Sequence, residues 1–476
     1  MNLKNYEFIL LCSAAGGLGW GIRGQYGHES GATMAACLVS FAIGIGLWGR
    51  IPFTQLLRAL SLAALVTGFG GSMTYGQTLG LTQDAPLIGN WESWRWGMLG
   101  IFIKGGLWIS FFGLFLGIGL SRNQFNINEI TVHSVLSVFV LFLGVALLNE
   151  PFDPEEKILP YFYFSDHWKW EPDSILSPRR EKWGGLLCVL LYWISLTLFV
   201  KKQALPIRLA TFGFIFGGIG FCAGQAIQSF HAWNPGFLGS FNEYINWWNM
   251  METAFGAIWG AGMAIGVLSS RRQIFEAGAG ISVEKHKISK SSEWIALVIM
   301  AIAGLAWNIG SFEYFDYFAD LAWTMIIVPL VLVSVGSIWP VAWINVIVLL
   351  PISAKTIREL SYNHQEWNTP TSYIFLGVIP FLLACWASKE LFRGISKNNV
   401  ILSYRSFLAS ALGMTWIYFL LNFAFFRFPW IWAPWTPRTL NGIIFLTCTL
   451  LMTYLGLKAR RSLSNLQSSN PIDQGD

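Results

Sequence analysis

Long apolar runs follow one another along almost the whole chain. Most are about 17–25 residues long, the length at which an α-helix crosses a hydrocarbon core of roughly 30 Å. They predict about fourteen membrane-spanning helices, near residues 7–25, 30–48, 57–81, 96–120, 131–149, 184–200, 207–230, 249–268, 293–309, 322–337, 339–354, 372–388, 405–423 and 441–457. We therefore expect an all-α, polytopic integral membrane protein with one transmembrane domain over 1–461 and a disordered tail over 462–476.

The stretch 322–354 fits either one long helix or two short ones, and the basic residues favour two. Lys and Arg are enriched in cytoplasmic loops. With two helices that turn near Gly336 to Pro340, every basic cluster faces the same side of the membrane. The clusters include Arg50/Arg58, Lys201/Lys202/Arg208, Arg271/Arg272, Lys389/Arg393/Lys397 and Lys458/Arg460/Arg461. This arrangement predicts that both termini are cytoplasmic and that the long loop 150–183 lies on the outer face.

The composition agrees with a membrane location. Charged residues make up 12% of the chain, against about 25% in an average soluble domain, and hydrophobic residues make up 54%. The net charge of +5 does not indicate a nucleic-acid partner, because the basic residues lie in short clusters at the ends of apolar runs. All six cysteines lie inside apolar runs, so they predict neither a disulfide framework nor a metal site.

Three predicted helices end alike, which suggests an internal repeat of helix hairpins. The similar ends run from Gly16-Gly17 to Gly24-Gln25, from Gly70-Gly71 to Gly76-Gln77, and from Gly217-Gly218 to Gly224-Gln225. A shift of 148 residues aligns 68–123 with 216–271 without a gap. The identity is low, so chance is the competing explanation. Repeats of this kind are common in secondary transporters, whose binding sites form where repeats meet. The repeats and most buried polar residues lie in a polar half at about 1–272, and the helices at about 293–461 contain few polar residues, so we expect this half to be an apolar scaffold.

A few polar side chains lie inside the apolar runs, where a Lys, Arg or Asp at the helix centre costs about 2.5–3.5 kcal/mol on insertion scales. The candidates for binding a solute or an ion are Arg23, Gln25, His28, Glu29, Gln77, Lys104, Gln225, Gln228 and Glu252. Lys104 and Glu252 align under the 148-residue shift, which predicts that they form a buried ion pair or a pair that exchanges partners as the repeats move. We expect the whole set to line one polar cavity that opens outward.

Each candidate also has a purely structural interpretation. Arg23 and Glu29 could be interfacial side chains that reach water, and Lys104 could belong to a structural ion pair. The glutamines could bridge helices through hydrogen bonds of modest energy.

The sequence favours a secondary transporter of the inner membrane, coupled to protons or another ion, for a small polar solute such as a saccharide. Glu29 and Glu252 would take up protons, and the glutamines would bind the solute. The alternative is a membrane-embedded glycosyl or acyl transferase that acts at the outer face on a lipid-linked substrate, because the polar residues concentrate toward the outer ends of the helices. A non-catalytic subunit of a larger complex is a third possibility.

Motifs for metal, phosphate or nucleophile chemistry are absent from the sequence. The chain has no HExxH, no GxxxxGK[ST] phosphate loop and no GxSxG, so we expect no cofactor and no metal. The expected partners are the lipid bilayer and a small polar solute, and the sequence leaves the oligomeric state open. A transporter predicts a polar path that continues toward the cytoplasm, whereas an enzyme predicts a sealed inner side.

Overall fold

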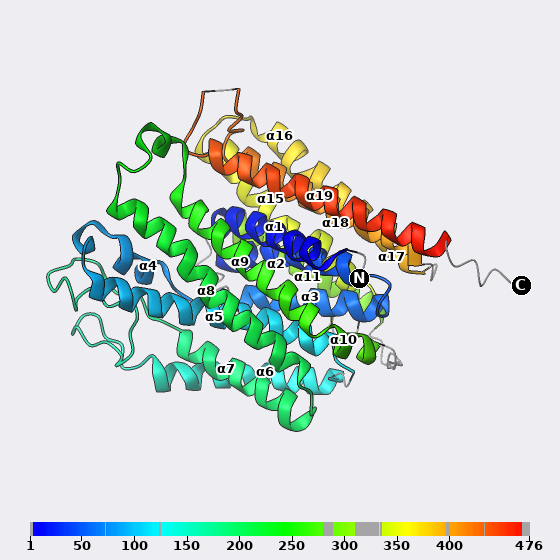
Figure 1. Cartoon of the computed structure of the whole chain (residues 1–476), viewed down its shortest axis with the longest axis horizontal. Helices are drawn as coiled ribbons and strands as arrows, with labels where there is room; N and C mark the ends of the chain where they lie inside the picture. The colour runs from blue at the N-terminus through cyan, green and yellow to red at the C-terminus, as the bar shows by residue number, and fades with distance from the viewer. Residues whose placement is uncertain are drawn as a thin grey trace, which may run out of the picture.

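The computed structural model describes residues 3–71, 73–122, 125–278, 289–309, 333, 336–396, 400–432 and 434–468. The protein is 78% helical and the described residues contain no strand, which confirms the predicted all-α class. The long helices run side by side along one axis, and α1 begins at the same end of the molecule at which α19 finishes (Figure 1). We call this the terminal end, and the opposite end, which carries the loop 149–182, the loop end.

The first part of the chain forms α1 (Asn5–Arg23), α2 (His28–Leu47), α3 (Phe53–Gly70), α4 (Gly76–Gln83), α5 (Trp91–Leu120), α6 (Ile127–Leu148), α7 (Trp183–Ser195), α8 (Leu205–Trp233), α9 (Trp247–Ser269) and α10 (Arg271–Gly278). The second part forms α11 (Lys290–Ile309), α14 (Trp339–Ala342), α15 (Leu349–Ile357), α16 (Thr369–Ser372), α17 (Ile379–Ser396), α18 (Val400–Phe425) and α19 (Thr439–Ser468). Short π-helical segments, η5 (Trp343–Ile347), η6 (Arg358–Asn363) and η7 (Tyr373–Val378), continue α14, α15 and α16.

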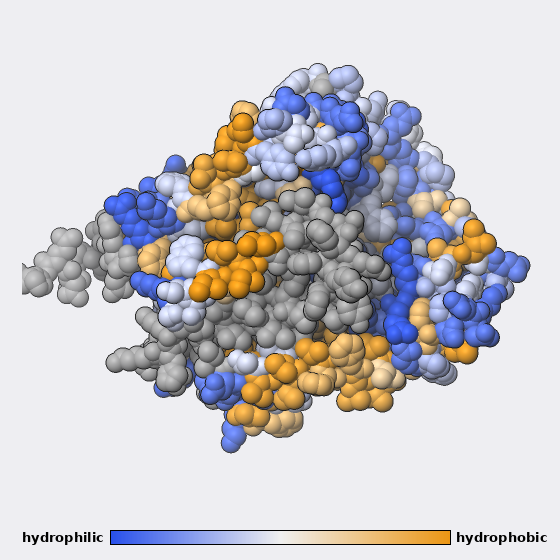
Figure 2. Space-filling model, turned by 180° about the vertical axis from the view of Figure 1, so that it is seen from behind, coloured by the Kyte–Doolittle hydropathy of each residue, from blue (hydrophilic) through white to orange (hydrophobic). Residues whose placement is uncertain are grey.

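Ten helical runs within the described residues are long and apolar enough to cross a membrane. They indicate a membrane-embedded, multi-pass protein. The most apolar window of α2 is 94% buried, whereas that of α6 is only 28% buried. Helices such as α6 and α17 therefore form the periphery, with apolar side chains turned outward. On the face seen in Figure 2, apolar patches lie between hydrophilic side chains that gather toward the two ends.

The structure corrects two predicted boundaries. The run predicted as one helix over 57–81 is interrupted, because α3 ends at Gly70 and α4 begins only at Gly76. The tail predicted to be disordered over 462–476 is helical as far as Ser468. The predicted helix over 339–354 begins at Trp339, after the non-helical residues 336–338. Its predicted predecessor, 322–337, lies almost wholly outside the described residues.

Six helices close a ring, which we call the six-helix ring. Helix α1 packs against α2, α2 against α3, α3 against α5, α5 against α8, α8 against α9, and α9 against α1. Helix α7 packs against α5 and α6 packs against α7, while α18 and α19 pack against α1 and α2. The short α4 lies against α5 and α8 at the loop end.

Small residues let the helices of the ring approach closely. A Cβ atom added to Gly16 of α1 would lie 2.1 Å from the carbonyl oxygen of Gly256 on α9. The converse distance, from a Cβ on Gly256 to the carbonyl oxygen of Gly16, is also 2.1 Å. The α5–α8 contact is equally tight, since a Cβ on Gly113 would lie 2.2 Å from the carbonyl oxygen of Leu209. Such contacts are typical of helix packing in membranes, where small residues stand at the interfaces.

Aromatic side chains fill the interior of the ring. Trp20 of α1 and Trp108 of α5 belong to helices that are not neighbours in the ring, yet their ring centroids are 5.1 Å apart. Trp259 of α9 lies 5.7 Å from Trp20 and 5.3 Å from Phe112 of α5. All four side chains are buried. The ring is therefore a packed core and not an open pore.

The close contact of α1 and α9 predicts the effect of adding one methyl group. Gly256→Ala should lower the free energy of unfolding by about 1–3 kcal/mol, because the new Cβ forces the two backbones apart. In the control Gly413→Ala, on α18, the Cβ meets nothing within 4 Å, so stability should stay unchanged or rise by about 0.5–1 kcal/mol. Thermal unfolding in detergent, followed by tryptophan fluorescence, measures both. Equal changes in the melting temperature of the two variants would contradict the close packing of α1 against α9.

Candidate functional site

A buried ion pair joins the two helices that close the six-helix ring. Arg23, the last residue of α1, places Nη2 2.9 Å from Oε1 of Glu252 on α9. Both side chains are almost fully buried. Arg23 Nη2 also donates to the hydroxyl of Tyr75, in the break between α3 and α4. The guanidinium lies 5.2 Å from the ring of Trp20 and 5.1 Å from that of Trp108, so it sits directly against the aromatic interior.

The short connection between α1 and α2 brings His28 to this pair. His28 begins α2, and its Nδ1 lies 3.5 Å from Arg23 Nη1. Its ring also packs edge-on against Tyr75, with centroids 5.2 Å apart. The connection passes so close to the carboxylate of Glu252 that a Cβ on Gly24 would lie 2.7 Å from Oε2. We call Arg23, His28, Tyr75 and Glu252 the Arg23 cluster.

The second part of the chain adds cations to the cluster that sequence reasoning missed. Lys355 of α15 lies so close to the α1–α2 connection that its Nζ would be 2.9 Å from a Cβ on Gly27. The adjacent Thr356 and Tyr26 bring their hydroxyls to 3.3 Å. The charge of Lys355 acts on both Glu29 and His28. Lys355 follows the apolar run 339–354 directly, so in the sequence it resembles an ordinary helix end.

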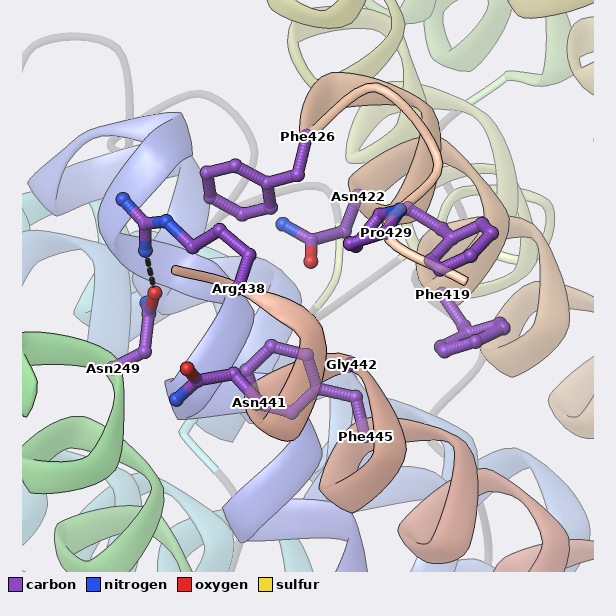
Figure 3. A pocket seen from close by; sticks show the side chains of 10 residues that line it. Asn249, Phe419, Asn422, Phe426, Pro429, Arg438, Asn441, Gly442 and Phe445 are labelled. Atoms are coloured by element: carbon purple, nitrogen blue, oxygen red, sulfur yellow. Dashed lines mark hydrogen bonds between the residues drawn. The ribbon is translucent and has the colours of Figure 1, made fainter. Parts of the chain in front are cut away.

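Arg438, just before α19, approaches the same region from another side. Its guanidinium donates to the side-chain oxygen of Asn249 on α9 and lies 4.2 Å from the ring of Phe426 (Figure 3). Burial lowers the pKa of Arg438 to about 10, while the charge of Glu252 acts in the opposite direction. The side chain therefore stays charged at neutral pH. Beside it lies a cavity of about 10 Å³, the size of one water molecule.

The predicted pairing of Lys104 with Glu252 is wrong. Lys104 Nζ lies 2.6 Å from Oε1 of Glu181, at the end of the loop 149–182, and donates to the hydroxyl of Thr78 on α4 at 2.7 Å. Glu181 also accepts hydrogen bonds from the hydroxyl of Ser165 and the backbone N–H of Phe164. The repeat alignment could not reveal this partner, since Glu181 lies in a loop outside the aligned segments. In this structure Lys104 fastens the loop to α4 and α5.

Two of the glutamines also hold α4. Gln77 donates to the carbonyl oxygen of Ser177 at 2.7 Å and accepts from the backbone N–H of Arg179 at 2.9 Å. Gln225 of α8 donates to the hydroxyl of Thr82 at 2.7 Å and to Gln83 at 3.0 Å. Helix α4 is thus bound to both the loop and the ring.

The remaining candidates lie near the cluster or keep an unused acceptor. Gln25 and Glu29 stand in the same α1–α2 segment as His28. The side-chain oxygens of Gln25 and Gln228 are buried and have no hydrogen-bond partner among the described residues. Of the nine predicted residues, Arg23, His28 and Glu252 are therefore brought together directly, whereas Lys104, Gln77 and Gln225 act on α4.

The comparisons with known proteins add no family. No protein-family model matches the sequence, and none of the curated proteins matches it significantly. Within the described part of the chain, no group of three or more His, Cys, Asp and Glu side chains could hold a metal ion.

The network around Lys104 predicts a large effect on stability. Lys104→Met should lower the free energy of unfolding by about 3–5 kcal/mol, because it leaves the carboxylate of Glu181 buried and unpaired. The double variant Lys104→Met/Glu181→Gln should recover part of that loss. Thermal unfolding checks the first effect, and faster tryptic cleavage of the loop 149–182 checks its release.

A control keeps this test specific. Arg272→Met breaks an exposed ion pair with Glu276, which should cost no more than about 1 kcal/mol. If Lys104→Met lowers the free energy of unfolding by no more than Arg272→Met does, the loop 149–182 does not depend on the pair between Lys104 and Glu181.

Proposed function

We propose that the protein is a secondary transporter of the inner membrane, coupled to protons or another ion, for a small polar solute such as a saccharide. The observation that carries the proposal is the buried pair between Arg23 and Glu252. Charges inside membrane helices are rare and mark ion pathways or substrate sites. This pair lies between two helices of one ring, next to a broken helix, which is a common site architecture in transporters.

The pair is suited to changing partners. Removing one partner of a buried ion pair is costly, so a transported ion or solute must replace the partner that it displaces. Glu252 can exchange Arg23 for a proton or cation, and Arg23 retains the hydroxyl of Tyr75. The small-residue contact between α1 and α9 lets the two helices approach closely beside the pair.

The order of helices supports an internal repeat as part of this proposal. Three hairpins, α1–α2, α3–α5 and α8–α9, supply the six-helix ring, and the second helix of each packs against the first helix of the next. The repeat, a total of about fourteen spans and cytoplasmic termini together complete the proposed architecture.

A second candidate function is a membrane-embedded transferase that acts at the loop end on a lipid-linked substrate. It is favoured by the aromatic interior, because Trp20, Trp108 and Trp259 close the ring on one side of Arg23. In a transporter the same side chains would form a closed gate. His28 or Glu252 would serve as the general base of the transferase.

Solute uptake by reconstituted vesicles tests the proposal. The parent protein should take up a member of a panel of polar solutes when a proton or sodium gradient is imposed. Glu252→Gln should abolish gradient-driven accumulation, because the amide cannot exchange a proton, yet still allow downhill exchange of solute. The matched control Glu276→Gln, on the exposed helix α10, should leave uptake unchanged.

A different outcome of the same experiment would favour the transferase. If the parent moves no solute but modifies a lipid-linked sugar or acyl donor, and Glu252→Gln abolishes that reaction, the transferase replaces the transporter.

A further inference from the structure

We propose that the Arg23 cluster binds the phosphate group of its ligand, at the start of α2 between Arg23, His28 and Lys355. The inference rests on the proposed function and names the chemical class of the solute.

The backbone at the start of α2 is arranged for an anion. Gly27, the residue that caps α2, has a φ of 85° and provides no side-chain cap hydrogen bond. The N-terminus of a 20-residue helix carries a partial positive charge and N–H groups that point outward along the axis. Phosphate groups bind at such ends. Gly27 also leaves room for Lys355, whose Nζ occupies the space beside it.

A second observation is independent of the helix end. Arg23 is only 1% exposed, and its Nε has no hydrogen-bond partner among the described residues. Its Nη1 faces His28 Nδ1. Because a guanidinium only donates hydrogen bonds, Nδ1 is the acceptor in this contact and Nε2 of His28 carries the proton. Arg23 therefore keeps one buried N–H group without an acceptor, next to His28, the first residue of α2.

Cations outnumber carboxylates around this point. Among the described residues, Arg23, Arg179 and Lys355 act electrostatically on His28, and Arg438 acts on Glu252. The carboxylates that face them are Glu252 and Glu29. With Arg358, which acts on Lys355, five cations stand against two carboxylates among the described residues, and this excess of positive charge favours an anion such as phosphate.

The cations around the site differ in exposure. Arg179 and Arg358 are exposed, Lys355 is half-buried and Arg23 is buried. A group of like charges raises the local concentration of anions. Arg358 acts on Lys355 and also lines a mostly apolar cavity of about 770 Å³ beside Ile357 and Phe381. A phosphate could therefore arrive as a soluble ester or as the head group of a lipid whose chain occupies this cavity.

Phosphate binding to the full-length protein in detergent tests the inference. Equilibrium dialysis with radiolabelled inorganic phosphate should show saturable binding. Lys355→Gln should weaken it by about tenfold or more, while Lys355→Arg, which keeps the charge, should preserve it. Arg427→Gln is the matched control, because Arg427 is an exposed cation paired with Glu366 and should not matter.

A second arm identifies the source of the phosphate. Protein extracted from vesicles of phosphatidylcholine and phosphatidic acid is examined by native mass spectrometry. If retention of phosphatidic acid depends on Lys355 but inorganic phosphate does not bind, the ligand is a lipid phosphate. If neither probe depends on Lys355, the inference is overturned.

The outcome is separable from that of the proposed function. Uptake of a neutral solute that phosphate does not inhibit would overturn the phosphate site and leave the transporter intact. Phosphate binding that depends on Lys355, without uptake of any solute, would support the phosphate site and contradict the transporter.

Discussion

The meeting of α1, α5, α9 and the break before α4 depends on the need to neutralise one buried guanidinium. Arg23 ends α1 in a place with almost no access to water, so its charge must be balanced from within the protein. Glu252 supplies the balancing negative charge, and the hydroxyl of Tyr75 accepts a further hydrogen bond. The rings of Trp20 and Trp108 lie close to the guanidinium. These partners come from four different stretches of the chain. Satisfying one cation therefore fixes the relative positions of α1, α5, α9 and the break before α4.

The close contact between α1 and α9 makes the pairing of Arg23 with Glu252 possible. Arg23 can reach Glu252 because Gly16 and Gly256 let α1 and α9 cross with touching backbones. Gly24 then allows the α1–α2 connection to lie against the carboxylate. The glycine pattern, which in the sequence indicates only close packing, thus also determines which charges can meet.

The sequence predicts the fold class well and the contacts of the site only in part. Run length and hydropathy identify helices because a bilayer demands both properties locally. The polar candidates were found for the same reason, since any charge inside an apolar run is conspicuous. Partners are not local, however. Lys104 pairs with Glu181 from a loop, and Lys355 arrives from a half of the chain expected to be scaffold. The break at 71–75 was missed because Gly-Gly within an apolar run suggests helix packing as readily as an interruption.

The interruption between α3 and α4 has a mechanical consequence. Helix α4 is fastened to the loop 149–182 through Gln77 and through Thr78, whose hydroxyl contacts Ser165 and Lys104. Loop and helix therefore hold each other in place through side-chain hydrogen bonds. Tyr75, in the break between α3 and α4, places its hydroxyl on Arg23. The loop is thus joined to the buried charge by a continuous series of bonds, from Ser177 through Gln77 and Tyr75 to Arg23.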